Sequence, residues 1–175
     1  MSATAPLAVS GVVEQTWALL EQVPDPEIPV VSIRELGILR EINEHDGIVE
    51  VVITPTYSGC PAMGQIEDDV RGALAGQAMN VRVVTRLAPA WTTDWISAAG
   101  KDKLRAYGIA PPHTVQQPDR VVRFQPRRRD REQDVACPNC TSGNTTETSH
   151  FGSTACKALY KCLDCLEPFD YFKPF

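Results

Sequence analysis

Cys137-Pro138-Asn139-Cys140 and Cys162-Leu163-Asp164-Cys165 are the two stretches that determine how the C-terminal part of this chain folds. Each has Cys-x-x-Cys spacing, in which a tight knuckle directs two thiolates toward one metal ion. The 21 residues between Cys140 and Cys162 are slightly more than the roughly 15–20 typical of zinc ribbons. Together, Cys137, Cys140, Cys162 and Cys165 predict one structural zinc per chain, with zinc favoured over iron.

The segment between the knuckles supports a ribbon. Residues 145–160 are rich in Thr, Ser, aromatic and apolar residues, as expected for a short β-hairpin. A module of about 40 residues buries too little surface to fold alone, whereas structural zinc contributes on the order of 10–16 kcal/mol in small fingers. We therefore expect a small β zinc-ribbon module over residues 135–175.

Two other side chains near the knuckles are alternative ligands. Cys156 could replace Cys165, giving the set Cys137, Cys140, Cys156 and Cys162, although Cys-x5-Cys makes a poorer knuckle. Cys156 could instead be a small buried hydrophobe or a sulfur beside the site. His150 is a weaker substitute ligand and fits an exposed hairpin histidine better. The role of Cys156 is left open.

Composition limits the class of protein. The chain has 175 residues, 43% of them hydrophobic, which suits one ordinary domain plus a small module. No basic residue precedes Arg34, and no apolar run approaches the roughly 20 residues needed to span a bilayer. The net charge is −5, and acids interrupt the basic run at 127–132. We expect a cytoplasmic protein that binds neither membrane nor nucleic acid, since a nucleic-acid-binding ribbon needs a basic surface.

The N-terminal part alternates helices and strands. Its hydrophobic periodicity and turn residues predict helices over 9–22, 61–77 and 93–107 and strands over 36–42, 48–54 and 80–87. Asp46-Gly47 supplies the positive backbone angles of a hairpin turn. The fold class is α+β, with helices packed on a small mixed or antiparallel sheet. We expect this α+β domain to cover residues 1–112, followed by a proline-containing linker over 113–134 and the ribbon over 135–175.

Cys60 stands apart from the other cysteines, in Ser58-Gly59-Cys60-Pro61. With Pro61 at the first helical position, Cys60 falls at or beside the helix N-cap. The positive end of a helix favours a thiolate there, which could bind a soft metal, hold an iron–sulfur cluster transiently or react with electrophiles. The alternative is a buried, inert cysteine, and spacing alone does not separate the two.

Catalytic machinery is not evident in the sequence. Asp25 and Glu27 are expected to lie in a stiff, exposed turn with three prolines, where helix termination and solvation explain them adequately. The sequence has no nucleophile elbow, no glycine-rich phosphate loop and no His-Glu pair on a helix. We expect no catalytic residues and no intrinsic catalysis.

Longer motifs carry a resemblance to a known family. Asp25–Val30 and Thr54–Pro61 resemble the SufT-like metal–sulfur cluster assembly domain family. Four further segments restrict the match from this broad domain family to one of its subgroups: residues 90–92, 104–112, 151–160 and 167–173. With these, the whole chain resembles the D-component family encoded with the bacterial phenylacetyl-CoA epoxidase of phenylacetate catabolism.

The resemblance implies an accessory function. The epoxidase is a di-iron monooxygenase fed by a flavin and iron–sulfur reductase, and its D component is expected to help insert or maintain iron or iron–sulfur centres in the oxygenase and reductase components. Cys60 matches the signature cysteine of the domain family, and Asp25 and Glu27 match its acidic turn. Because one thiolate per chain would leave a bridging cluster incomplete, a homodimer is expected. The alternatives are a structural epoxidase component with an inert Cys60, or a thiol-redox protein.

Overall fold

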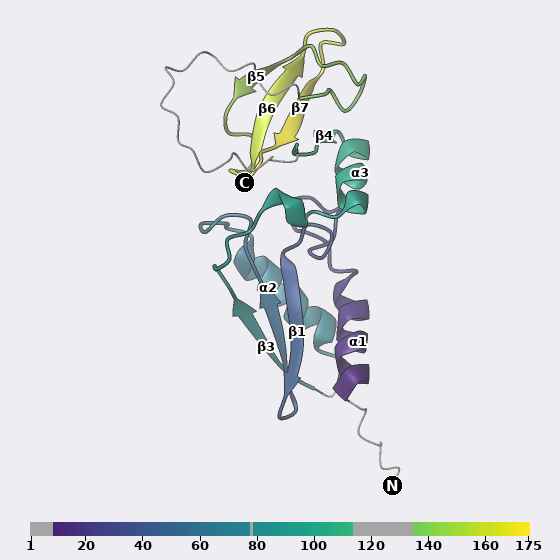
Figure 1. The fold of residues 1–175 in the computed structure, drawn as a ribbon, viewed down its shortest axis with the longest axis vertical. Coiled ribbons are helices and arrows are strands. Elements are labelled where there is room, and N and C mark those ends of the chain that lie inside the picture. The colour runs from purple at the N-terminus through teal and green to yellow at the C-terminus, as the bar shows by residue number, and fades with distance from the viewer. Residues whose placement is uncertain (1–8, 78, 114–134) are drawn as a thin grey trace, which may run out of the picture. The chain divides into compact units, whose positions relative to one another are not determined.

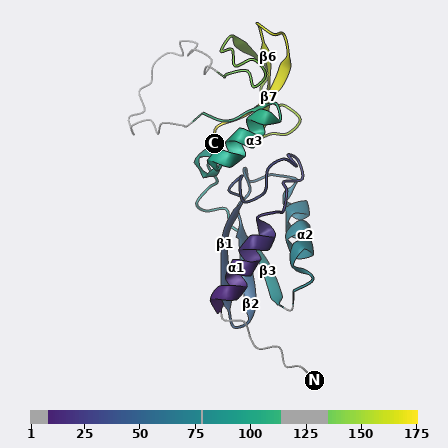
Figure 2. The ribbon, with the colours of Figure 1, turned by 90° about the vertical axis from the view of Figure 1, so that its right-hand side faces the viewer.

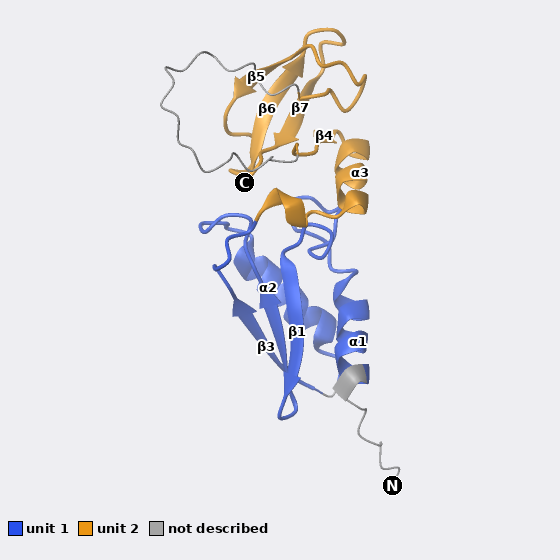
Figure 3. Cartoon of the chain, viewed as in Figure 1, with its two compact units in different colours: residues 1–91 blue, residues 92–175 orange. Residues whose placement is uncertain are grey.

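The computed structural model describes residues 9–77, 79–113 and 135–175, which fall into two compact units, residues 1–91 and 92–175 (Figure 3). Most of the expected linker 113–134 lies outside the described residues. The segment 92–112 belongs to the second unit rather than to the first, although the sequence places it in the N-terminal domain. The reason is that residues 109 and 110 pair as a strand with residues 170 and 171.

The first unit contains a mixed three-stranded sheet and two helices. Its elements in chain order are α1 (Val9–Leu20), β1 (Leu39–His45), β2 (Ile48–Ile53), α2 (Met63–Leu74) and β3 (Asn80–Thr85) (Figure 1). The strand order is β1-β2-β3, with β1 antiparallel and β3 parallel to β2. Helix α1 contacts β1 and α2, and α2 contacts β3, so the helices form a layer against the sheet (Figure 2). The predicted α+β fold with a mixed sheet is confirmed.

The β1–β2 hairpin is tighter than the strand ranges predict. Asp46 and Gly47 have φ of 53° and 75°, and they alone form the turn, because β1 continues to His45. Residues 43–45 remain paired with 48–50, which the polar composition of this segment does not suggest. The sequence pattern therefore locates the turn correctly, but it predicts that the first strand ends at residue 42 instead of at His45.

The second unit contains a four-stranded sheet. Its elements are η1 (Thr93–Trp95), α3 (Ala98–Ala106), β4 (Ile109–Ala110), β5 (Thr145–Ser149), β6 (Lys157–Cys162) and β7 (Pro168–Phe172), with strand order β4-β7-β6-β5. The short β4 pairs in parallel with β7, which joins the α3 segment to the ribbon. The predicted hairpin appears as the antiparallel β5–β6 pair.

The helix predicted over 93–107 is two separate pieces. Ile96, after η1, has an extended backbone, and the Ser97 Oγ then accepts a hydrogen bond from the Gly100 N–H at 2.9 Å as the N-cap of α3. Gly108, with φ of 90°, follows the helix as predicted. Among the described residues, no helix is long and apolar enough to cross a membrane.

Candidate functional site

The four knuckle cysteines converge at one end of the ribbon sheet. Cys162 is the last residue of β6, and the Cys137–Cys140 knuckle precedes β5. All four Sγ atoms lie within 4.8 Å of one another. The Sγ–Sγ distances are 3.7 Å for Cys137–Cys165 and 3.6 Å for Cys140–Cys162. A tetrahedral zinc with Zn–S bonds of about 2.3 Å requires Sγ–Sγ distances of about 3.8 Å. The geometry therefore fits a four-thiolate metal site.

The backbone shapes both knuckles in the same way. Thr141 and Leu166, which each follow the second cysteine of a knuckle, have φ of 63° and 67°. In the second knuckle, the Cys165 N–H donates to the Cys162 Sγ at 3.5 Å. Backbone donors of this kind stabilise a thiolate. The second knuckle is thus arranged for anionic sulfur.

Asp164 ties the second knuckle to the loop that follows the first. Its carboxylate accepts a hydrogen bond from the Ser142 Oγ and another from the Asn144 Nδ2 at 2.7 Å. These bonds, from Ser142 first and then Asn144, lower the pKa of Asp164. Sequence reasoning gives Asp164 no role, although an acidic residue inside a Cys-x-x-Cys knuckle is a signal that could indicate one.

The pKa values of Cys162 and Cys165 are shifted in opposite directions. The hydrogen bond from the Cys165 N–H is the largest influence on Cys162. Together with the Asp164 N–H and the neighbouring thiols it outweighs desolvation and lowers the pKa of Cys162 to about 7. For Cys165, the Glu167 N–H acts to lower the pKa, but desolvation and the neighbouring thiols outweigh it and raise the pKa to about 12. Once one thiolate forms, its neighbours resist ionisation. A divalent cation removes this repulsion, which explains why such a cluster favours metal.

Cys156 and His150 lie outside the group of four. Cys156 is buried, and its Sγ contacts the Thr154 Oγ1 at 3.0 Å. His150 is exposed, and its Nδ1 lies 3.3 Å from the Glu147 Oε1. Neither side chain joins the only metal-ligand group found among the described residues. The geometry favours the two-knuckle set over the set that includes Cys156, while the ligand roles themselves stay a prediction.

Cys60 does not occupy the helix position that the sequence predicts. Helix α2 begins at Met63 with Ala62 as N-cap, so Cys60 lies two residues before the cap. Pro61 falls in a turn instead of the first helical position, and the Met63 N–H donates to the Cys60 carbonyl at 3.4 Å. The prediction of Cys60 at or beside the N-cap is wrong. Cys60 is half-buried, which leaves part of it accessible to a partner.

The acidic turn has a structural role that the sequence does not reveal. Asp25 is only 6% exposed, so its expected exposure is wrong. Its Oδ1 accepts hydrogen bonds from the Glu27 N–H at 2.9 Å and the Ile28 N–H at 2.8 Å, while its own N–H donates to the Val31 carbonyl at 2.9 Å. These bonds close the loop on itself. Glu27, in the same loop, is half-buried.

Replacing Asp25 with alanine is expected to destabilise the first unit by about 2 kcal/mol, because two backbone N–H groups lose their acceptor. Asp25→Asn retains an acceptor oxygen and should keep most of the stability. Urea denaturation of both variants measures the difference. Equal stability of Asp25→Ala and the parent chain would contradict the structural role.

Comparison with known proteins supports both modules. Residues 123–173 match the family model described as the PaaD zinc beta ribbon domain, and residues 14–85 match the model described as an iron–sulfur cluster assembly protein. Over 164 residues the chain is 46% identical to the putative D subunit of the 1,2-phenylacetyl-CoA epoxidase of Escherichia coli K12, covering 92% of each chain. The chain belongs to this D-component family. The family resemblance drawn from the motifs is confirmed.

The N-terminal part of this D-component family member has relatives of its own. It is 35% identical over 91 residues to the Fe-S protein maturation auxiliary factor YitW of Bacillus subtilis, covering 50% of this chain and 88% of the relative. A crystal structure of a domain of unknown function, DUF59, from Bacillus anthracis matches with a TM-score of 0.50 and 28% identity, over 54% of this chain and 92% of that one. The chain thus combines an iron–sulfur assembly domain with a zinc ribbon.

Proposed function

We propose that this chain is a non-catalytic accessory factor of a phenylacetyl-CoA epoxidase that aids the assembly of iron or iron–sulfur centres in the oxygenase and reductase components. One observation carries the proposal. A segment that matches iron–sulfur assembly proteins and contains Cys60 is joined to a PaaD zinc ribbon, and a relative named as an epoxidase subunit aligns with 92% of the chain.

In this proposal the cysteines divide the work. Cys137, Cys140, Cys162 and Cys165 hold one zinc per chain, which stabilises the ribbon. Zinc carries no redox chemistry and its four thiolates leave no open position, which suits a structural ion. Cys60 is the thiol that handles iron or a cluster as cargo, with the ion leaving for the partner protein after binding. Its partial exposure is consistent with such transfer.

Asp25 and Glu27 support the Cys60 domain in different ways. Asp25 fixes its own loop through two backbone hydrogen bonds. Glu27 lies half-buried in the same loop, so its carboxylate is the second acidic group of the turn. A cluster shared by Cys60 thiolates requires two chains, so the working form in the cytoplasm is a homodimer under this proposal.

The first test separates an assembly factor from a structural component. Epoxidase components are purified from cells that lack this chain, and their iron content and activity are measured. Adding the purified chain alone is expected to restore little activity, whereas adding the chain together with ferrous iron, sulfide and reductant restores both iron content and activity. A structural component would restore activity immediately without iron, and that result would overturn the assembly function.

The same samples test a thiol-redox function. A redox protein would change the disulfide state of its partner without changing the partner's iron content. Iron content that rises in parallel with activity supports assembly. Activity that rises at constant iron content contradicts it.

A further inference from the structure

Phe151 is a large apolar side chain that the second unit leaves exposed. It lies in the loop 150–156 between β5 and β6, and it is 64% exposed. Its ring does not belong to the buried cluster that forms the core of the ribbon. A single exposed apolar residue is common on protein surfaces. The contacts around Phe151 distinguish it from such a residue.

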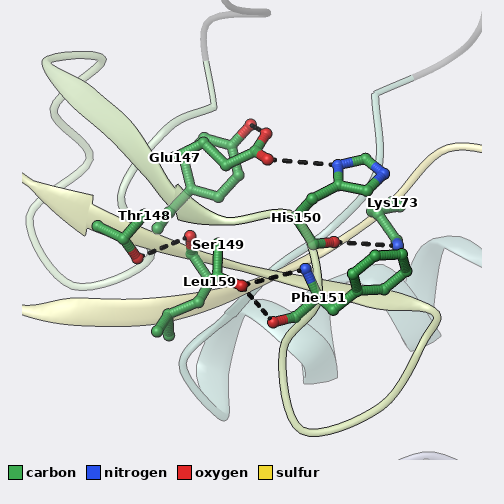
Figure 4. Close-up of polar contacts among 8 residues, drawn as sticks. Glu147, Thr148, Ser149, His150, Phe151, Leu159 and Lys173 are labelled. Atoms are coloured by element: carbon green, nitrogen blue, oxygen red, sulfur yellow. Dashed lines mark hydrogen bonds and ion pairs between the residues drawn. The ribbon is translucent and has the colours of Figure 1, made fainter.

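The backbone on both sides of Phe151 is held in place. The Phe151 N–H donates to the Ser149 Oγ at 3.3 Å, and the same hydroxyl donates to the Phe151 carbonyl at 2.7 Å (Figure 4). The Gly152 N–H then donates to the Lys157 carbonyl at 2.8 Å. A Cβ at residue 152 would lie 3.0 Å from the Asp170 Oδ1 and 3.3 Å from the Lys157 Cβ, so this close approach favours glycine. The loop is therefore fixed against the sheet.

The ring of Phe151 is held as well. The Lys173 Nζ lies 4.5 Å from the ring centroid, and the His150 ring meets the Phe151 ring edge to face at 5.1 Å. The same Nζ donates to the His150 carbonyl at 3.1 Å, which ties the loop to the residue after β7 (Figure 4). An exposed ring that is ordered before binding loses little conformational entropy when a partner covers it. Aromatic anchors of this kind dominate the energy of many protein interfaces.

Lys173 supplies the charge of this surface. It is half-buried, and its ammonium contacts the His150 carbonyl and the Phe151 ring. Within the described ranges of the chain, no carboxylate forms an ion pair with Lys173. Glu147, the acidic residue of this region, lies 3.3 Å from the His150 Nδ1 instead (Figure 4). Because a half-buried ammonium gains most from a charged acceptor, the surface is complementary to a carboxylate on a partner.

A second exposed ring extends the surface. Phe175 is 44% exposed and borders the same surface hollow as His150 and Lys173. Two other exposed apolar residues of this unit, Leu163 and Leu166, flank the second zinc knuckle at the opposite end of β6. The residues around the β5–β6 loop therefore form a separate surface with aromatic and cationic character.

We propose that His150, Phe151, Lys173 and Phe175 form a docking surface for a protein partner. The partner offers an apolar hollow for the Phe151 ring and a carboxylate for the Lys173 ammonium. The inference rests on the proposed function, under which this partner is an epoxidase component. The docking surface belongs to the second unit and Cys60 to the first, so docking and iron handling are separable by mutation.

Binding of the zinc-loaded full chain to the purified oxygenase and reductase components is measured by isothermal titration calorimetry. The parent chain is expected to bind one of them, and Phe151→Ala, with unchanged circular dichroism and zinc content, should bind about 30-fold more weakly. Phe151→Tyr keeps the ring and should stay within about threefold of the parent chain. Leu163→Ala, at the opposite end of β6, is the matched control and should bind like the parent chain. Binding to neither component, or equal binding by Phe151→Ala, would overturn the docking surface.

The charge contact has a test that does not depend on Phe151→Ala being folded. Lys173→Gln should bind about tenfold more weakly at low salt and should lose most of the salt dependence of the parent chain. The same salt dependence in Lys173→Gln and the parent chain would contradict the carboxylate contact. Sedimentation tests whether a second copy of this chain is the occupant: a dimer that Phe151→Ala dissociates, with component binding unchanged, would also overturn the proposal.

Iron loading of the same components separates this inference from the assembly function. If the parent chain loads iron and Phe151→Ala binds and loads equally well, the docking surface is wrong and the assembly function stands. If the parent chain binds through Phe151 but loads no iron, the assembly function is wrong and the docking surface stands.

Discussion

Cys165→Ser is expected to lose the zinc and to unfold the ribbon strands β5 to β7, whereas Cys156→Ser keeps one zinc per chain. The Cys165 Sγ lies 3.7 Å from the Cys137 Sγ inside the group of four, while the Cys156 Sγ contacts Thr154. Serine preserves the shape of cysteine but does not supply a thiolate. Because a small module cannot fold on its own apolar surface, loss of the metal should remove the ordered ribbon rather than weaken it slightly.

Mass spectrometry measures the zinc content of both variants. The chemical-shift dispersion of the ribbon resonances in NMR spectra shows whether the ribbon is folded. The two variants discriminate between the ligand sets, since one set contains Cys165 and the other contains Cys156. Full zinc in Cys165→Ser together with loss of zinc in Cys156→Ser would show that the alternative set is right. A chelator added to the parent chain should reproduce the Cys165→Ser spectrum.

The features that were predictable from the sequence are those that short segments determine. Cys-x-x-Cys spacing brings two thiols together within a few residues, and the order of the knuckles around a hairpin then places all four Sγ atoms at one end of the sheet. Asp46-Gly47 identifies the first hairpin because positive φ is a local requirement. These signals need no knowledge of distant contacts.

The features that escaped prediction depend on contacts made elsewhere. Residues Ile109–Ala110 form a strand only because β7, about 60 residues further on, offers them an edge. The burial of Asp25 follows from the return of the chain at Val31, whose carbonyl accepts the Asp25 N–H. The start of α2 at Met63 similarly depends on a turn closed at Cys60. Propensity and pattern do not contain this information.

Cys60→Ser is expected to abolish delivery of iron while leaving the chain folded. The loop is held by backbone hydrogen bonds, from Cys60 N–H to the Tyr57 carbonyl at 3.1 Å and from Met63 N–H to the Cys60 carbonyl, which serine retains. Only the thiol is lost, and with it the soft ligand that iron or a cluster requires. Ser58→Ala, an exposed change two residues earlier in the same loop, is the matched control.

The loss of iron delivery in Cys60→Ser should be large. Removing a residue that only supports a metal ligand already lowers metal affinity about 10–100-fold, and removing the ligand itself should lower it at least as much. Circular dichroism and zinc content of Cys60→Ser should equal those of the parent chain. A variant that unfolds or loses zinc would show that Cys60 serves the fold, which would contradict its assigned role.

The most direct measurement is the iron content of epoxidase components after anaerobic maturation with the parent chain, with Ser58→Ala or with Cys60→Ser. Iron per oxygenase and per reductase is counted under identical iron and sulfide supply. The account predicts full loading with the parent chain and with Ser58→Ala, and at least about tenfold less loading with Cys60→Ser. Loading by Cys60→Ser equal to that by the parent chain would contradict the central claim that this thiol handles iron for the epoxidase.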